Sequence, residues 1–481
     1  MTPNVPIIAW APDADPTTPG VMVQAENLLP TLRGYAPDFS AIAAIGFTSA
    51  MPEAPLSAKR LEITSASSLI FTLAGTSTRL YYLLYGGAPV DRSNGGGPYV
   101  ATTYADPWQF DTISGVVLAS NVFNPVQVTT DLPAVNFGPI SGAPAARTIC
   151  VQRNFVVAGG FNSGTAAWPY ADGWWCSEQE DYTGWTPDIA TQCARGRLTA
   201  TPGAIVRMIA FQDSILAFKE GSLYRGTYTG PTANTWSWPV LSSAVGIVGT
   251  QAVTQAGSVL YWMAPDGVYR YAGGGIERIQ SAPWNWLLDQ VAGSTGLQYT
   301  QAQWDPVRRV VRFYVMLFGA NGDGVGIAYH PETDRWGSFE LTGGVTVDVP
   351  LQVVPTVTDG PYGVAPRAAP GFFGLDDRVL KIYAGTPAES AFTTGDIGDD
   401  DAVVALTRAR VRFFRAPATS MLTHSHRMTL DDALTAGETS SRVDGKYDMS
   451  HSARWHRVRF DMTGAYEVSG FSVGPASAGK R

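Results

Sequence analysis

The chain has 481 residues and a formal net charge of −8, and only 15% of its residues are charged. Its 51 glycines, 33 prolines and many aromatic residues (14 Trp, 20 Tyr, 20 Phe) favour short strands joined by turns over a helical protein. The opening "MTPNVPIIAW" lacks the basic and apolar regions of a secretory signal, and no apolar run reaches the roughly 18 residues of a membrane helix, so we expect neither secretion nor membrane insertion.

Residues 1–55 are predicted to form an N-terminal extended arm. Two proline-rich stretches, "APDADPTTPG" and "LRGYAPDF", flank the amphiphilic "VMVQAENLLP". Because proline and glycine interrupt regular structure, this pattern disfavours a compact unit. Two placements stay open. The segment either supplies a strand that closes a barrel or propeller, or it reaches a neighbouring subunit.

Residues 56–400 are predicted to form a β-propeller body of about six blades. The stretch "AGSVLYWMAPDGVYRYAGGG" (256–275) has β-prone runs on both sides of a Pro-Asp-Gly turn, as in a hairpin. Similar hairpins are predicted around Glu220–Gly221 and around Asp376–Asp377. Looser copies recur about 45 to 85 residues apart, near the length of a four-stranded blade.

One short helix is predicted in this body, at residues 281–292 ("SAPWNWLLDQVA"). Ser281 is the expected N-cap, and Pro283 lies just inside the helix, where a missing N–H is tolerated. No long segment of the body repeats apolar residues with a helical period.

Residues 401–481 are predicted to form a small C-terminal antiparallel β domain. Residues 402–481 hold 12 basic and 7 acidic residues, a net charge of +5, which leaves −13 for residues 1–401. In "VVALTRARVRFFRAPA" the alternation of a strand puts Arg408, Arg410 and Arg412 on one face and Ala409, Val411 and Phe413 on the other. The strand "RWHRVRFDM" repeats the pattern.

The arginines of these strands are the candidate partner-binding residues: Arg408, Arg410, Arg412, Arg415, Arg457 and Arg459. They can meet an acidic surface on a neighbouring subunit or the phosphates of a nucleic acid. Alternating charge that keeps an exposed sheet soluble and discourages edge pairing is an equal alternative.

No residue pattern predicts catalysis, a cofactor or a metal site. His424 and His426 share a strand face, but no cysteine or carboxylate cluster lies near in sequence, so a solvated face is expected. The acidic stretches 321–324 and 395–401 lack the spacing of calcium loops and are expected to be turn residues. The three cysteines match no metal spacing and are expected to be reduced structural thiols made in a cytosol. Asp-box turns, nucleophile elbows and phosphate loops are absent from the sequence.

Four segments carry a resemblance to a known family: "GWWCSEQEDYTGWTP", "GAIVRMIAFQDSILAFKEGSLYRGTYTG", "GIVGTQAVTQAGSVLYWMAPDGVYRY" and "RWHRVRFDMTGAYEVSGFSVGP". In this order they resemble the tail hub or nozzle proteins of short-tailed phages, also called packaged-DNA stabilization proteins. The resemblance implies a virion tail protein, made in the host bacterial cytoplasm. It also implies a propeller subunit that assembles as a homohexameric ring below the portal and its adaptor ring.

The resemblance further implies a structural protein and not an enzyme. Such a ring extends the DNA channel, retains the packaged genome without sequence specificity, and binds tail fibre, spike or tip proteins. An acidic body suits a channel along which DNA must slide, because each phosphate neutralised by Lys or Arg adds affinity. Two alternatives remain: a glycan-binding or glycan-hydrolysing propeller, for which the 14 tryptophans would serve as sugar-stacking platforms, and a scaffold propeller for protein partners.

Overall fold

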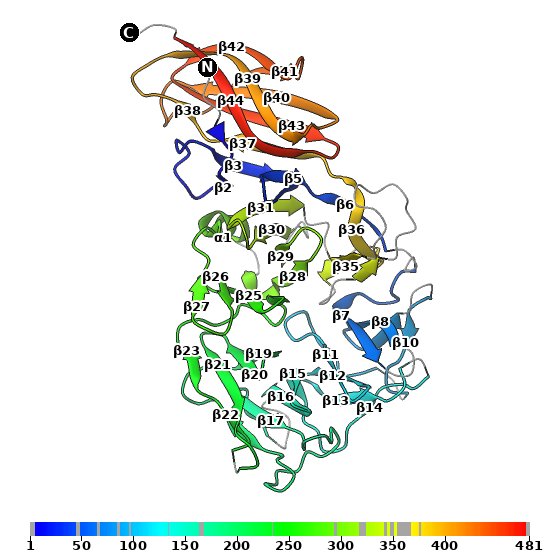
Figure 1. Ribbon diagram of the computed structural model, residues 1–481. Coiled ribbons are helices and arrows are strands. Elements are labelled where there is room, and N and C mark those ends of the chain that lie inside the picture. The colour runs from blue at the N-terminus through cyan, green and yellow to red at the C-terminus, as the bar shows by residue number, and fades with distance from the viewer. Residues whose placement is uncertain are drawn as a thin grey trace.

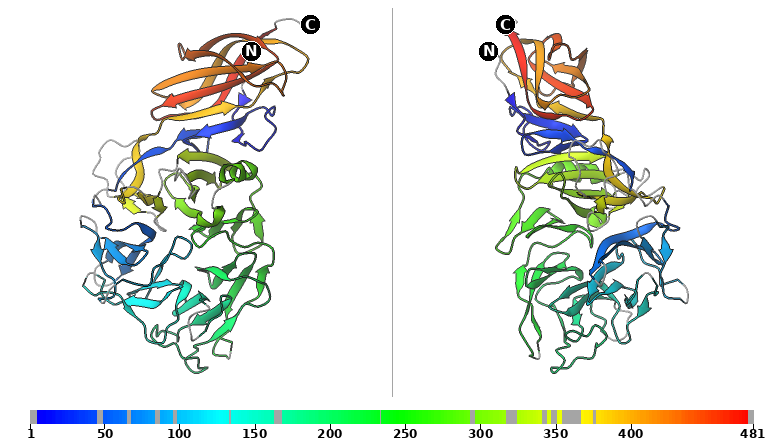
Figure 2. Two further views of the ribbon diagram at one scale, coloured as in Figure 1. Left: turned by 180° about the vertical axis from the view of Figure 1, so that it is seen from behind. Right: turned by 45° about the vertical axis from the view of Figure 1, so that its right-hand side comes forward.

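The computed structural model shows an elongated molecule, with a ring of small sheets at one end and a two-layered β-sandwich at the other (Figures 1 and 2). It describes residues 5–44, 49–64, 68–83, 87–95, 98–132, 134–162, 168–232, 234–292, 296–316, 324–340, 344–346, 351–353, 367–374 and 377–477. Both marked chain ends lie at the sandwich. The predicted all-β propeller fold is confirmed.

Six blades follow one another along the chain, each built from consecutive antiparallel strands. The first three contain β7 (Pro55–Thr64), β8 (Ser68–Thr76), β9 (Leu80–Leu83) and β10 (Val90–Asp91); β11 (Gln109–Ile113), β12 (Val116–Asn121), β13 (Asn124–Thr129) and β14 (Gly138–Pro139); and β15 (Ala146–Gln152), β16 (Phe155–Phe161), β17 (Gly173–Cys176) and β18 (Arg195–Arg197).

The next three blades contain β19 (Ile205–Phe211), β20 (Ser214–Lys219), β21 (Leu223–Tyr228), β22 (Trp236–Ser237) and β23 (Val240–Ser242); β24 (Val253–Ala256), β25 (Val259–Ala264), β26 (Gly267–Tyr271) and β27 (Ile276–Arg278); and β28 (Gln301–Asp305), β29 (Val310–Met316), β30 (Gly324–His330) and β31 (Arg335–Glu340). The hairpins predicted from turn chemistry are β20–β21 and β25–β26.

A seventh, composite sheet closes the ring between the sixth blade and the first. It contains β32 (Gly344–Thr346), β35 (Gly371–Gly374), β36 (Leu380–Pro387) and β6 (Phe39–Ala43). The inner strand β32 contacts both β28 and β7, and β35–β36 is the third predicted hairpin. Its outer strand β6 comes from the N-terminal segment. This part of the segment therefore supplies a strand that closes the propeller, which is one of the two placements that the sequence left open. A two-stranded sheet, β33 (Leu351–Val353) with β34 (Arg367–Ala369), completes this region.

The sandwich is built from both ends of the chain. One layer, the β39 sheet, contains β1 (Val5–Pro6), β5 (Tyr35–Pro37), β44 (Glu467–Ser477), β39 (Val404–Arg415) and β42 (Tyr447–Ala453), and it continues through β4 (Leu28–Pro30) into β31 of the sixth blade. The other, the β43 sheet, contains β2 (Ala9–Trp10), β3 (Val21–Glu26), β37 (Ser390–Thr394), β38 (Ile397–Gly398), β43 (Trp455–Thr463), β40 (Thr419–Arg427) and β41 (Thr435–Ser441).

The junction between propeller and sandwich is tightly packed. The buried Tyr35 hydroxyl accepts a hydrogen bond from the Trp10 amide (2.9 Å) and donates one to the Trp336 carbonyl oxygen (3.0 Å). A Cβ added at Gly34 would lie 2.0 Å from the carbonyl oxygen of Val468, so only glycine lets β5 approach β44 this closely. One hydrophobic cluster continues from the blades into the sandwich. These contacts hold the two parts as one body.

The predicted helix forms as α1 (Trp284–Val291), followed by the short η1 (Leu297–Tyr299), but its capping differs from the expectation. Ser281 makes no capping bond; its hydroxyl donates to Asp334 (2.8 Å). Asp13 instead accepts hydrogen bonds from the backbone amides of Asn285 and Trp286, each at 2.7 Å. A carboxylate from the N-terminal segment therefore caps this helix. In the described part of the chain no helix is long and apolar enough to cross a membrane.

Candidate interaction site on the C-terminal sandwich

The β39 sheet carries the predicted row of arginines on its outer face. Arg408, Arg410 and Arg412 are exposed, whereas the alternate residues Ala409 and Val411 are buried in the sandwich core. This alternation follows from the two-residue period of a strand. Arg415, near the end of the strand, is also exposed and lies opposite Glu467 of β44.

Arg457 and Arg459 do not join this row, because they lie on the outer face of the other layer. Arg457 makes a bidentate pair with Asp396 (3.1 and 2.8 Å). Arg459 makes a bidentate pair with Glu26 (2.7 and 2.6 Å), and its Nε donates to Asp461 (2.9 Å). These hydrogen bonds lower the pKa of the Glu26 carboxyl. The six candidate arginines thus divide into four on the β39 sheet and two that pair with carboxylates of their own chain.

Asp396 has a different role from the one expected of an acidic turn residue. Its carboxylate is fully buried and also accepts a hydrogen bond from Arg427 (2.6 Å), so two arginines share it. Asp400, four residues further along the chain, accepts the Trp455 indole N–H (2.9 Å). The expectation for 395–401 therefore fails at Asp396. Most of the other acidic stretch, 321–323, lies outside the described residues.

A groove of about 440 Å³ lies in the outer face of the β43 sheet, at the end where β43 finishes and β40 begins. Its charged lining residues are Glu26, Glu389, Asp461 and Arg459, and the apolar Met421 is exposed beside them. With three carboxylates and one guanidinium, the groove carries a net negative charge. Glu389 is exposed at its rim.

Four histidines gather inside the sandwich: His424 and His426 of β40, His451 of β42 and His456 of β43. His424 is fully buried, so the expected solvated strand face is wrong for this residue. The His456 Nε2 lies 2.9 Å from the carbonyl oxygen of Val404, which can only accept, so Nε2 carries the proton. In the neutral ring Nδ1 then accepts, and the His424 Nε2 donates to it at 2.9 Å.

Burial and mutual repulsion disfavour protonation of three of these rings. Burial, together with repulsion from the neighbouring histidines, lowers the pKa of His424 to about 4. Burial also lowers the pKa of His456, against its bonds to two carbonyl oxygens, and the pKa of His426. Among the described residues, no group of three or more His, Cys, Asp or Glu side chains is placed to hold a metal ion.

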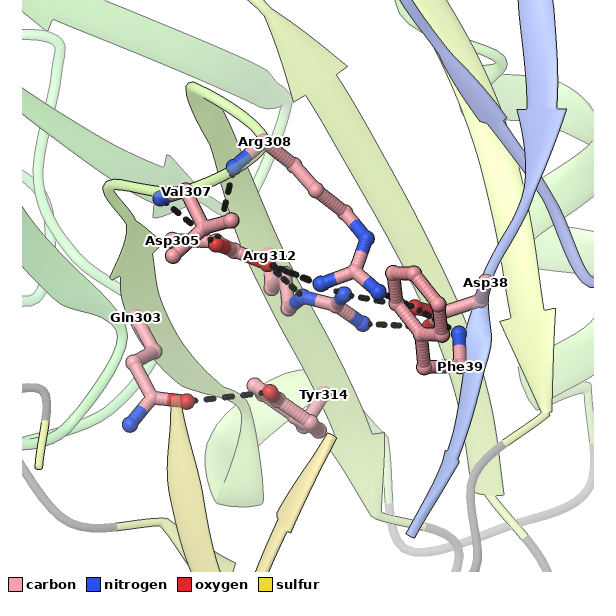
Figure 3. Close-up of polar contacts among 8 residues, drawn as sticks. All are labelled: Asp38, Phe39, Gln303, Asp305, Val307, Arg308, Arg312 and Tyr314. Carbon is pink, nitrogen blue, oxygen red and sulfur yellow. Dashed lines mark hydrogen bonds and ion pairs between the residues drawn. The ribbon is translucent and has the colours of Figure 1, made fainter. Parts of the chain in front are cut away.

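A second buried polar cluster, the seam cluster, consists of Asp38, Asp305, Arg308 and Arg312 and joins the N-terminal segment to the sixth blade (Figure 3). Arg312 binds both oxygens of Asp38 (2.7 and 2.9 Å) and also Asp305 (3.0 Å). Arg308 reaches the same two carboxylates at 3.2 Å. Although burial opposes ionisation of Asp38, Arg312 and Arg308 hold its pKa below the usual value.

Aromatic rings enclose the seam cluster. The Arg312 guanidinium lies 4.5 Å from the ring centre of Tyr383 and 4.8 Å from that of Phe339, and Arg308 lies 4.3 Å from that of Phe39. With Arg312 and Asp305 fully buried, these charges serve packing and are closed to a ligand. The sequence interpretation missed all four members. The available signal was Arg312 itself, a single charge within the apolar run of β29.

The axis of the propeller is nearly closed by side chains. The Lys59 ammonium donates to the Phe110 carbonyl oxygen (2.9 Å), and the Gln251 amide crosses from the fifth blade to the first to reach the Leu56 carbonyl oxygen (3.0 Å). The remaining cavity of about 30 Å³ has room for about one or two waters. None of its described lining residues is a carboxylate.

The three cysteines, Cys150, Cys176 and Cys193, are free and buried. Burial raises the pKa of the Cys176 thiol to about 12 and that of Cys193 to about 11. Thiols with raised pKa values carry little thiolate, the reactive form, at neutral pH. They are therefore packing residues.

No family model matches the sequence, and no curated protein matches it. Solved structures to which the chain is similar include a glycoside hydrolase, at 10% identity and a TM-score of 0.28 over 90% of this chain and 100% of its own. BamB from Moraxella catarrhalis, at 10% identity, gives a TM-score of 0.32 over 84% and 96%. A puromycin-hydrolysing peptidase of Mycobacterium tuberculosis, at 11% identity, gives 0.36 over 73% and 62%. Scores this low carry no inference about function.

Proposed function

We propose that this protein is a structural subunit of the tail of a short-tailed bacteriophage, a nozzle or hub protein. In this proposal, copies form a homohexameric ring below the portal and adaptor rings, extend the DNA channel, retain the packaged genome and bind fibre, spike or tip proteins. The subunit works by assembly, without turnover.

The observation that carries the proposal is the exposed arginine row of β39, displayed on a sandwich that one continuous sheet joins to the propeller. A row of outward-facing guanidiniums on a rigid element is suited to binding an acidic protein surface. The segments that resemble nozzle proteins support the same conclusion, since they form parts of the third to fifth blades and the strands β43 and β44.

The channel of such a ring lies between subunits and not along the axis of a single propeller. Near that axis, among the described residues, Lys59 and Gln251 make contacts between blades beside a cavity of about 30 Å³. The net charge of −13 is that of residues 1–401, which form the propeller and also several strands of the sandwich. Where these residues line the channel, their charge repels phosphates and keeps DNA free to slide.

The burial of the tryptophan side chains argues against the glycan alternative. Of the 14, nine are buried and five are half-buried, and none is fully exposed. A stacking platform must offer a free ring face to a sugar. These rings instead fill the blades and the junction, as Trp262 does against Phe218 at a centroid distance of 5.4 Å.

Electron microscopy of the purified protein and of virions tests the proposal. We expect rings with a central hole and specific antibody labelling of the virion tail, together with no hydrolysis of chromogenic glycosides. A protein absent from virions, or glycoside hydrolysis abolished by changing one or two carboxylates, would contradict it.

A further inference from the structure

The arginine row of β39 lies beside small residues of the neighbouring strand β44. Arg408, Arg410 and Arg412 stand opposite Gly474, Ser472 and Gly470 of β44 in the sheet register. Because the side chains at these positions of β44 are small, the longer arginine side chains project beyond them on this face. Asp448, the cross-strand neighbour of Arg408 on β42, pairs with Lys446 instead (3.1 Å).

The groove on the other layer has the complementary charge. Glu26, Glu389 and Asp461 face a single cation, Arg459, which leaves a net of about two negative charges against three positive charges on the row. Arg459 already binds Glu26 and Asp461, whereas Glu389 stands exposed at the rim. Glu389 is therefore the carboxylate most available to an incoming guanidinium.

The row and the groove lie on opposite outer faces of one sandwich. Ala409 and Val411 of β39 and Phe460 and Met462 of β43 belong to one shared core between the layers. Residues that alternate with them point away from that core in opposite directions. A chain therefore cannot place its own arginine row in its own groove, but a second copy can.

We infer that the arginine row of one subunit docks into the acidic groove of the next, so that identical sandwiches join head to tail. Such a contact between two different faces repeats around a closed ring or along a filament. The inference rests on the proposed function and identifies its subunit interface. The partner that we infer is a second copy of this chain, because the same protein carries both the basic row and an acidic groove of matching charge.

Cross-linking of singly substituted chains tests the orientation. Chains with Arg410→Cys and chains with Glu389→Cys are mixed and treated with a short bis-maleimide. We expect dimers that contain one chain of each kind, and little cross-linking of either variant alone. Cross-linking of Arg410→Cys to itself, or none in the mixture, would overturn the inference. The wild type is the background control, since its cysteines are buried.

Charge reversal tests the chemistry. Arg410→Glu is expected to raise the apparent Kd of self-association at least tenfold, by roughly 1.4 kcal/mol or more, and to reduce its salt dependence. Glu389→Arg in the same chain should restore association, because each interface again pairs opposite charges. The matched control is Arg153→Glu, an exposed arginine in the β15–β16 turn of the propeller, which should leave association unchanged.

The outcomes separate this interface from the proposed function. Rings and tail labelling that persist in Arg410→Glu would overturn the interface and leave the nozzle proposal standing. Loss of binding to duplex DNA in Arg410→Glu, with unchanged self-association, would identify phosphates as the occupant and also overturn it. A wild type that neither forms rings nor labels tails would remove both. Circular dichroism of each variant confirms that the fold is kept.

Discussion

The propeller seam and the sandwich interior bury polar side chains in opposite ways. In the seam cluster, two aspartates and two arginines are charged and balance each other. In the sandwich, four histidines gather, and burial lowers the pKa values of His424, His426 and His456, which favours the neutral form of these three rings. The seam depends on every partner being present, because removing one leaves a buried charge. The stability of the histidine cluster instead requires that the buried rings stay unprotonated.

Removing one cation from the seam gives the largest expected effect. Arg312→Met leaves Asp38 and Asp305 without their main partner, and a broken buried pair typically costs about 3–5 kcal/mol of unfolding free energy. Urea unfolding of the purified protein measures the loss. The control is Arg309→Met, whose exposed pair with Glu332 should contribute less than about 1 kcal/mol. Equal losses of unfolding free energy in the two variants would show that the seam cluster contributes no more to stability than an exposed ion pair.

Acid separates the two clusters. The pKa of His424 is about 4 in the folded protein against 6.5 ordinarily, so between these values the unfolded chain binds more protons. Stability is then complete above about pH 6.5 and falls as the pH drops toward 4, by on the order of 3 kcal/mol for this residue. The lowered pKa of Asp38 acts in the same direction but in a lower range, because its contribution is lost only as the pH falls below the ordinary value of 3.8.

Urea unfolding at pH 7.5 and 4.5 checks this expectation. His424→Gln, which cannot take up a proton and keeps a donor for His456, should lose less stability on acidification than the wild type. The groups that face His424 are His426, His451 and His456, and Glu438 of β41 lies 3.8 Å from His451. An unchanged acid loss in His424→Gln would assign the sensitivity to other groups.

The smallest effect is expected at the cap of α1. Asp13→Ala removes the acceptor for two backbone amides and should cost about 1 kcal/mol, as the loss of an N-cap does. Asp213→Ala, whose carboxylate is 92% exposed, is the control and should change stability by less than about 0.5 kcal/mol. If the two variants unfold at the same urea concentration, Asp13 does not stabilise the helix.

Features set by neighbouring residues could be predicted from the sequence, and features assembled from distant residues could not. The Pro-Asp-Gly hairpin and the exposed face of Arg408, Arg410 and Arg412 follow from turn chemistry and strand alternation, which are local. The bond between Asp38 and Arg312 joins residues 274 positions apart, and Asp13 reaches Asn285 across 272. Ser281 was a sound local choice of cap, but a distant carboxylate took its place.

The interleaving of the two chain ends sets an order for events on the ribosome. Gln24 of β3 bonds Thr393 of β37, which is made 369 residues later. At roughly 5–20 residues per second, β3 waits on the order of 20–75 s for that neighbour. The blades emerge complete during this interval, each from adjacent strands, whereas the earliest-made ribbon stays unmatched. The circle of sheets is thus closed by β6, from the N-terminal segment, only after β36 has been synthesised.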